Sequence, residues 1–267
     1  MEPVLHLIVV ALLSLCWGSF LASFSWRIAF DQPLFASRSY CPSCQSTIFW
    51  YDNFPVFSWL LLSGSCRQCS MIISSVYPFI ETLTACFMTI LFYKMFLTAP
   101  IPVSEVATIS LSFFFYTLFF SALIGSTATD LFAMIIPQLF SIWLVPLGII
   151  SSLLSYTSIS YIESILGALF GYGLLWFVAF IFKKYTNRDG IGQGDMELLC
   201  LIGSFTGIQG VWITLLLGSI SGLAIGGSYL YLTKQSKHTH IPFGPFLAIS
   251  AICYVLFKQH LVKFFLF

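Results

Sequence analysis

The chain has 267 residues, of which 58% are hydrophobic and 8% are charged, and its mean hydropathy is +0.95. A soluble domain cannot bury that much apolar surface, so the composition excludes a soluble globular protein and indicates that lipid is the main solvent. The formal net charge of +1 at pH 7 argues against nucleic acid or an acidic polymer as a partner.

Stretches apolar enough to cross a bilayer, which takes about 20 residues in a helix, recur along the chain. The sequence predicts eight spans, at residues 4–26, 76–98, 106–128, 134–154, 160–182, 196–209, 211–232 and 243–266. The first has no basic segment before it and no clear small-residue cleavage site after it, so we expect a retained helix rather than a removed signal peptide. We therefore expect an all-α polytopic membrane protein with about eight transmembrane helices.

Lysine and arginine are unevenly distributed between the two sides of a membrane crossed by these eight spans. Eight of them fall on one side: Arg27, Arg38, Arg67, Lys183, Lys184, Arg188, Lys234 and Lys237. Only Lys94, Lys258 and Lys263 fall on the other side. Because cytoplasmic loops carry the excess of positive charge, segments 27–75, 183–195 and 233–241 are expected to be cytoplasmic, with both termini facing outward.

The one sizeable polar insertion, residues 27–75, carries the motifs CPSC at 41–44 and CRQC at 66–69. Each CxxC turn directs two sulfurs toward one point, and a tetrahedral zinc ion takes two such turns. We therefore predict a closed, structural zinc site formed by Cys41, Cys44, Cys66 and Cys69. Disulfides or unligated thiols are the alternatives, and a reducing cytoplasm disfavours disulfides.

These features predict three parts in the chain. Residues 1–26 form the first transmembrane helix, and residues 27–75 form a cytoplasmic zinc-binding insertion between the first and second spans. Residues 76–267 form a membrane core of seven helices.

Two aspartates lie at predicted helix ends, and ionisable groups at membrane depth are rare and usually functional. Asp130 lies in STATDLFAMIIPQ between the third and fourth spans, and Asp195 lies in GQGD where the sixth span begins. Both are expected at the cytoplasmic ends of helices, so they can face each other at one depth. Gly192 and Gly194 let the backbone bend and another chain approach, and we expect them to form the backbone of a substrate site.

Two carboxylates that share a site cannot both ionise cheaply, so one keeps its proton near neutral pH. Such a pair supplies a base that activates water and an acid that protonates a leaving amine, which favours hydrolysis of a peptide bond near the membrane surface. Two alternatives stay open: the aspartates cap helix N-termini, or they form a relay in a non-enzymatic transporter or assembly factor. Glu81, about a turn into the second span, suits either a functional or a packing role.

Several sequence blocks occur in a specific order and spacing that covers nearly the whole chain. They are GSFLASFSWRI at 18–28, the four cysteines, NFPVFSWLLLSGSCRQC at 53–69, YPFIETLTA at 77–85, TDLFAMIIPQ at 129–138, GQGDMELL at 192–199 and IPFGPFLAISA at 241–251. Together they resemble the type IV prepilin peptidases, which are bifunctional leader peptidases and N-methyltransferases of pilus and type II secretion systems.

The resemblance implies that Asp130 and Asp195 form the dyad of a GxGD-type aspartic peptidase. It implies cleavage of prepilins and pilin-like secretion proteins after a glycine that ends a short basic leader, at the cytoplasmic face of the bacterial inner membrane. It also implies methylation of the new N-terminus with S-adenosylmethionine, and it links the cysteine insertion to that step. A presenilin-like intramembrane protease is an alternative, but its partner aspartate typically follows a tyrosine, whereas Thr129 precedes Asp130.

Two positions depart from the family pattern. The family usually has Asp after the Ile-Pro of the first motif, where this chain has Gln138, and Lys two residues after the second aspartate, where this chain has Glu197. Neither change removes a proposed catalytic carboxylate. Glu197 places a negative group near Asp195, so we expect it to favour the protonated form of Asp195 and to shift the pH optimum.

Overall fold

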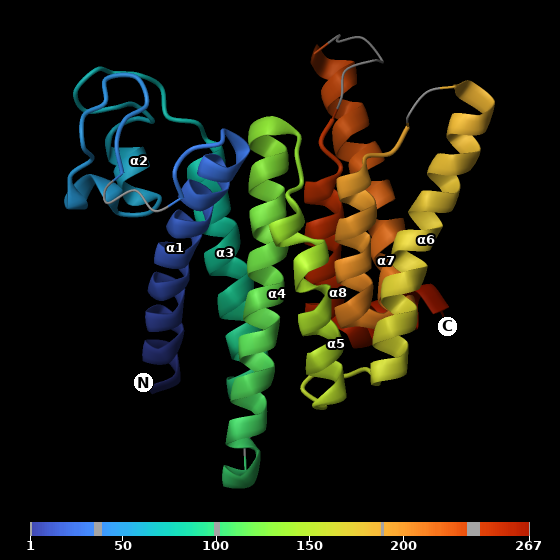
Figure 1. Ribbon diagram of the computed structural model, residues 1–267. Coiled ribbons are helices and arrows are strands. Elements are labelled where there is room, and N and C mark those ends of the chain that lie inside the picture. The colour runs from blue at the N-terminus through green and yellow to red at the C-terminus, as the bar shows by residue number, and fades with distance from the viewer. Residues whose placement is uncertain (1, 35–38, 99–101, 188–189, 234–240, 267) are drawn as a thin grey trace. The chain divides into compact units, whose positions relative to one another are not determined.

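The computed structural model of the protein describes residues 2–34, 39–98, 102–187, 190–233 and 241–266 (Figure 1). Its α-helices are α1 (Glu2–Ala29), α2 (Phe57–Leu61), α3 (Val76–Phe92), α4 (Val106–Ala133), α5 (Val145–Leu153), α6 (Tyr161–Thr186), α7 (Gln193–Thr233) and α8 (Gly244–Leu266). Shorter turns are η1 (Trp50–Asn53), η2 (Tyr93–Leu97), η3 (Val103–Glu105), η4 (Gln138–Phe140) and η5 (Ile142–Leu144). The only β pairing in these residue ranges is two isolated bridges, Tyr40 with Thr47 and Ser65 with Ile72. The predicted all-α class is confirmed.

Six helices of the described chain are long and apolar enough to cross a membrane: α1, α3 with its extension η2, α4, α6, α7 and α8. Their outward side chains are large and apolar, as in Leu169 and Leu223, which are 65% and 79% exposed. Small residues such as Ser126 and Thr129 are fully buried between helices, where they allow close approach. The protein is therefore a multi-pass membrane protein.

The predicted span at 134–154 is not one continuous helix. Met134 takes a left-handed conformation with φ of 55° and ends α4. Pro137 cannot donate a backbone hydrogen bond and disfavours the helical conformation of the residue before it, so helix resumes only after it. The turns η4 and η5 follow, then α5, and together they form a shorter apolar helical segment, Gln138–Leu153.

The predicted spans 196–209 and 211–232 are the two arms of α7. Gly207 interrupts the helix with φ of 71° and ψ of −175°, a region of backbone conformation that is essentially limited to glycine. Gly194, at the start of α7, lies against Ile136, and Ile136 also lies beside Gly244 at the start of α8. In the second arm of α7, Gly226 lies against Ile241. The start of α7 and its second arm at Gly226 therefore both lie beside residues at or just before the start of α8. As Figure 1 shows, α7 is a helical hairpin, and its first arm is too short to cross a bilayer by itself.

The chain divides into two compact units, Met1–Ala99 and Pro100–Phe267. In the first unit α1 packs along α3, and the segment between them carries the two CxxC motifs. In the second unit α6 packs on α7, while α8 packs on both α7 and α4. The finer division at residues 26 and 75 remains a prediction.

The start of α6 is fixed locally by a capping box. Ser160 Oγ accepts the backbone N–H of Glu163, and the Glu163 carboxylate accepts the backbone N–H of Ser160 at 2.9 Å. This reciprocal pair satisfies amide groups that a helix start leaves unpaired. Glu163 therefore has a local structural role at the start of α6.

Candidate active site and metal centre

Asp130 lies in the last turn of α4 and is 6% exposed. Its carbonyl accepts the N–H of Met134, which closes the helix, and the chain then runs extended toward Pro137. Its carboxylate accepts a hydrogen bond of 2.9 Å from the backbone N–H of Gly244, the first residue of α8. Two elements far apart in sequence therefore hold this side chain.

Asp195 lies in the first turn of α7 and is partly buried. A Cβ placed on Gly192 would lie 3.4 Å from Oδ2 of Asp195, so the carboxylate is directed back toward the residues that precede the helix. A helix N-terminus favours a negative group because its backbone N–H groups are unpaired there. Its place at a helix start agrees with the sequence-based expectation.

Asp130 and Asp195 are near enough for their carboxylates to repel each other electrostatically. Ile136 lies between the segments that carry them. Its Cβ is 2.7 Å from the position of a Cβ on Gly194, and its Cδ1 is 3.0 Å from that of a Cβ on Gly244. The end of α4, residues 134–137 and the starts of α7 and α8 thus converge on one site that holds two acids.

Gly192 and Gly194, the two glycines expected to form the backbone of a substrate site, differ in their surroundings. Gly192 is exposed just before α7, whereas Gly194 is packed against Ile136 of the same chain. Their role toward a substrate remains a prediction. Gly244 was not singled out from the sequence, although it lies in the quoted block IPFGPFLAISA, at the start of the last span.

The two positions that depart from the family pattern contact each other. Glu197, 4% exposed, accepts a hydrogen bond from the side-chain amide of Gln138. Ser141 and Gln193, which the sequence did not single out, also donate to this carboxylate. The expected effect of Glu197 on the protonation of Asp195 remains a prediction.

The four predicted zinc ligands form one cluster in the first unit. The sulfurs of Cys41, Cys44, Cys66 and Cys69 all lie within 4.8 Å of one another, and all four are free thiols. The sulfurs of Cys41 and Cys69 are 3.8 Å apart, which matches the edge of about 3.8 Å in a tetrahedron with zinc–sulfur bonds of about 2.3 Å. The cluster therefore fits a zinc ion.

The two CxxC turns have the same backbone structure. In each, the residue after the second cysteine donates its N–H to the carbonyl of the first, from Gln45 to Cys41 and from Ser70 to Cys66, both at 2.9 Å. Gln45 and Ser70 have φ values of 59° and 56°, and an isolated bridge closes each turn. The local sequence thus forms two equivalent hairpin turns that present their sulfurs to one point.

Two of these thiols have lowered pKa values, so they ionise readily to the thiolate form that binds a cation. A hydrogen bond from the Ser46 hydroxyl lowers the pKa of the Cys44 thiol to about 6, and backbone hydrogen bonds from Cys69 and Gln68 lower that of Cys66. A backbone hydrogen bond from Met71 lowers the pKa of the Cys69 thiol. Burial and the other three thiols oppose its ionisation more strongly, so the pKa of Cys69 rises to about 11. Because thiolates are the metal-binding form, a cation at the centre would remove this opposition.

Glu81, whose role the sequence left open, supports a strained turn in the first unit. Phe57 N–H donates to the Pro55 carbonyl at 2.6 Å across Val56, whose φ of 62° and ψ of −52° are those of a strained γ-turn. The Val56 N–H donates to Oε2 of Glu81 at 2.7 Å, and the Glu81 side chain is 6% exposed. This buried carboxylate therefore fastens the insertion to α3.

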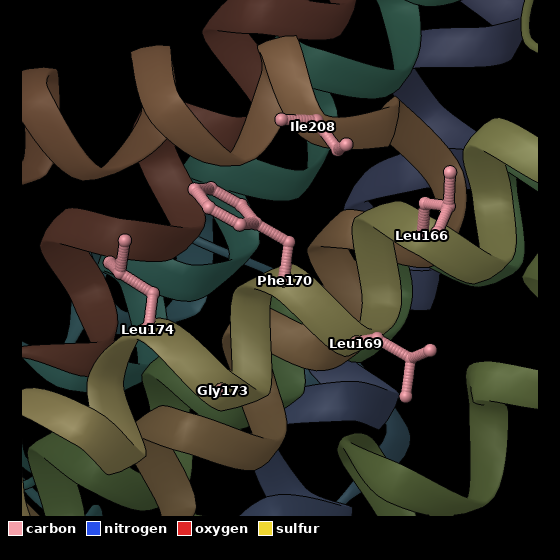
Figure 2. A pocket seen from close by; sticks show the side chains of 6 residues that line it. All are labelled: Leu166, Leu169, Phe170, Gly173, Leu174 and Ile208. Atoms are coloured by element: carbon pink, nitrogen blue, oxygen red, sulfur yellow. The ribbon is translucent and has the colours of Figure 1, made fainter.

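An open groove of about 470 Å³ lies between α6 and the second arm of α7. Figure 2 shows the residues that line it: Leu166, Leu169, Phe170, Gly173, Leu174 and Ile208. None of these side chains is polar, so the groove suits apolar groups and does not fit the charged groups of S-adenosylmethionine.

Comparison with known proteins gives matches in both units. Residues 12–95 match the bacterial peptidase A24 N-terminal domain, and residues 117–227 match the type IV leader peptidase family. The first match contains the four clustered cysteines and Glu81, and the second contains Asp130 and Asp195. No solved structure shows a significant match.

Three similar proteins carry the name prepilin leader peptidase/N-methyltransferase. The one from Aeromonas hydrophila is 32% identical over 240 residues, which cover 88% of this chain and 78% of the relative. The one from Stutzerimonas stutzeri is 34% identical over 81% of this chain and 71% of the relative. The one from Pseudomonas aeruginosa is 30% identical over 86% of this chain and 74% of the relative.

Proposed function

The chain belongs to the type IV leader peptidase family, and from this we propose that it removes the leader peptide of prepilins and then N-methylates the new N-terminal residue. The observation that carries the peptidase half of the proposal is the convergence of Asp130 and Asp195 on one site. Pilin-like secretion proteins are included among the proposed substrates.

The proposed cleavage uses the two carboxyl groups in complementary states. The ionised one takes a proton from water while the water oxygen bonds to the carbonyl carbon of the scissile peptide. The protonated one gives its proton to the peptide nitrogen, the carbon–nitrogen bond breaks, and the nitrogen leaves as an amine. Both side chains lie at helix ends rather than at mid-span, which gives water and a polar leader access to the site.

The four cysteines would hold a structural zinc ion. With four sulfur ligands the ion has no open position for a substrate, so its contribution is to cross-link the two CxxC turns. The resemblance to bifunctional leader peptidases implies that the insertion serves the methylation step, and we propose that role for it here. S-adenosylmethionine is the proposed methyl donor, and we assign no residue to its binding.

The proposed location is the bacterial inner membrane, with the zinc insertion and the aspartate pair on the cytoplasmic side. The excess of lysine and arginine in segments 27–75, 183–195 and 233–241 supports this orientation. Of those residues, Arg38, Arg188, Lys234 and Lys237 lie outside the described ranges.

The test is incubation of the purified protein with a prepilin and methyl-labelled S-adenosylmethionine, with cleavage and label transfer measured separately. We expect both activities in the wild type, and loss of cleavage by at least about 1,000-fold in Asp130→Asn and in Asp195→Asn. Asp31→Asn is the matched control, since Asp31 is exposed and its φ of 50° suits asparagine. Cleavage by Asp195→Asn at the wild-type rate would falsify the assignment of the pair.

A further inference from the structure

Glu197 is a buried carboxylate close to the aspartate pair but does not face it. It lies two positions after Asp195 in α7, and residues two apart on a helix point in different directions. It is 4% exposed, and the side chains that hydrogen-bond to it, Gln138, Ser141 and Gln193, are all neutral. A buried charge without a cation depends on hydrogen bonds for its stabilisation.

Three neutral side chains supply these hydrogen bonds. Gln193 Nε2 donates to Oε1 of Glu197 at 2.8 Å, and Ser141 Oγ donates to Oε2 at 3.1 Å. Gln138 Nε2 lies 3.4 Å from Oε1, at the long end of the range for such a bond. Both carboxylate oxygens of Glu197 therefore accept hydrogen bonds.

The donors come from the two segments that carry the candidate catalytic acids. Gln138 and Ser141 lie in and just after η4, eight and eleven residues beyond Asp130. Gln193 and Glu197 lie in the first two turns of α7, on either side of Asp195. The Glu197 carboxylate is thus hydrogen-bonded to the segment that follows Asp130, and it belongs to the helix that carries Asp195.

We propose that Glu197 is a positioning residue, whose hydrogen bonds to Gln138 and Ser141 set the separation of the Asp130 and Asp195 carboxyl groups. The inference rests on the proposed function, because only a catalytic pair makes that separation matter for rate. Mispositioning reacting groups by about 1 Å can slow an enzyme by about 100-fold. Glu197 therefore acts on kcat rather than on KM.

The test is a double-mutant cycle that exchanges the Glu197 carboxylate and the Gln138 amide, which contact each other. Glu197→Gln replaces one of the two acceptor oxygens with an NH₂ donor that faces the donors of its neighbours, and Gln138→Glu sets two carboxylates side by side. Each is therefore expected to lower kcat by about 10- to 100-fold with KM changed by less than about twofold. The variant with both substitutions restores an amide–carboxylate pair. It is expected to return kcat to within about threefold of the wild type.

Two further variants keep the outcome decisive. Ser141→Ala removes one donor, leaves the others in place and is expected to lower kcat by about 3- to 10-fold. Glu163→Gln, in the capping box of α6, is the matched control and is expected to keep the wild-type kcat.

The inference is overturned if both single substitutions keep the wild-type kcat, or if the double variant is as slow as the product of the single effects. A wild-type protein that cleaves no prepilin would instead reject the proposed function. The wild-type measurement in the same assay therefore separates the two failures.

Discussion

The backbone N–H of Gly244, at the start of α8, donates a hydrogen bond of 2.9 Å to Oδ2 of Asp130, at the end of α4. A Cβ on Gly244 would lie 2.7 Å from that oxygen and 3.0 Å from Cδ1 of Ile136. Only glycine lets the α8 backbone come this close, so the start of α8 fixes one of the two candidate catalytic acids.

Gly244→Ala is expected to displace the Asp130 carboxylate and to lower the rate of prepilin cleavage by about 10- to 100-fold. The protein should still insert in the membrane, because the contact involves one helix start. Gly227→Ala is the matched control, since a Cβ at that position would meet nothing within 4 Å beyond the adjoining backbone of its own helix. Equal cleavage rates for the two variants would show that the Gly244 contact does not matter for catalysis.

Metal analysis of the purified protein is expected to find about one zinc ion per chain, because four clustered thiols complete a tetrahedral site. Cys66→Ser should remove most of this zinc and reduce methyl transfer more than cleavage. Cys86→Ser replaces an exposed cysteine of α3 outside the cluster and should change neither. Zinc content unaffected by Cys66→Ser would reject the ligand set, and equal loss of both activities would reject the link to methylation.

Glu81→Ala removes the acceptor of the Val56 N–H and leaves the strained γ-turn without its support. The expected destabilisation is about 1–3 kcal/mol, the usual cost of leaving a buried polar group unpaired. It would be measured by chemical unfolding and by the rate of proteolysis within residues 27–75. Thr82→Ala, at an exposed neighbouring position of α3, should lower stability much less, and a similar loss in both variants would contradict the assigned role.

Gly207→Ala forces a side chain into the backbone conformation at the turn of the α7 hairpin, where φ is 71° and ψ is −175°. The cost of a non-glycine residue in this region is about 1–3 kcal/mol, so the thermal unfolding midpoint should fall. Gly227→Ala, in a regular helical part of α7, should keep or raise it, because alanine favours helix. An unchanged midpoint in Gly207→Ala would mean that the hairpin turn tolerates another conformation.

Much of the architecture follows from local features of the sequence. The apolar stretches correspond to the helices, and the CxxC motifs at 41–44 and 66–69 form the two matching turns around one sulfur cluster. The spans around Pro137 and Gly207 differ from prediction in length and continuity. There the total hydropathy is high enough for a span, but single residues with special backbone conformations decide where helix begins and ends.

The sequence by itself determined the membrane class, and it singled out the four cysteines that cluster and the two aspartates that lie at helix ends. Each of these depends on the chemistry of a short segment. Only the tertiary structure decided that the Gly244 amide holds Asp130 and that Gln138 pairs with Glu197. It also decided that α7 reverses, which brings its start and its second arm at Gly226 beside residues at or just before the start of α8. These contacts join positions up to 114 residues apart and arise from helix packing, which no local pattern of residues specifies.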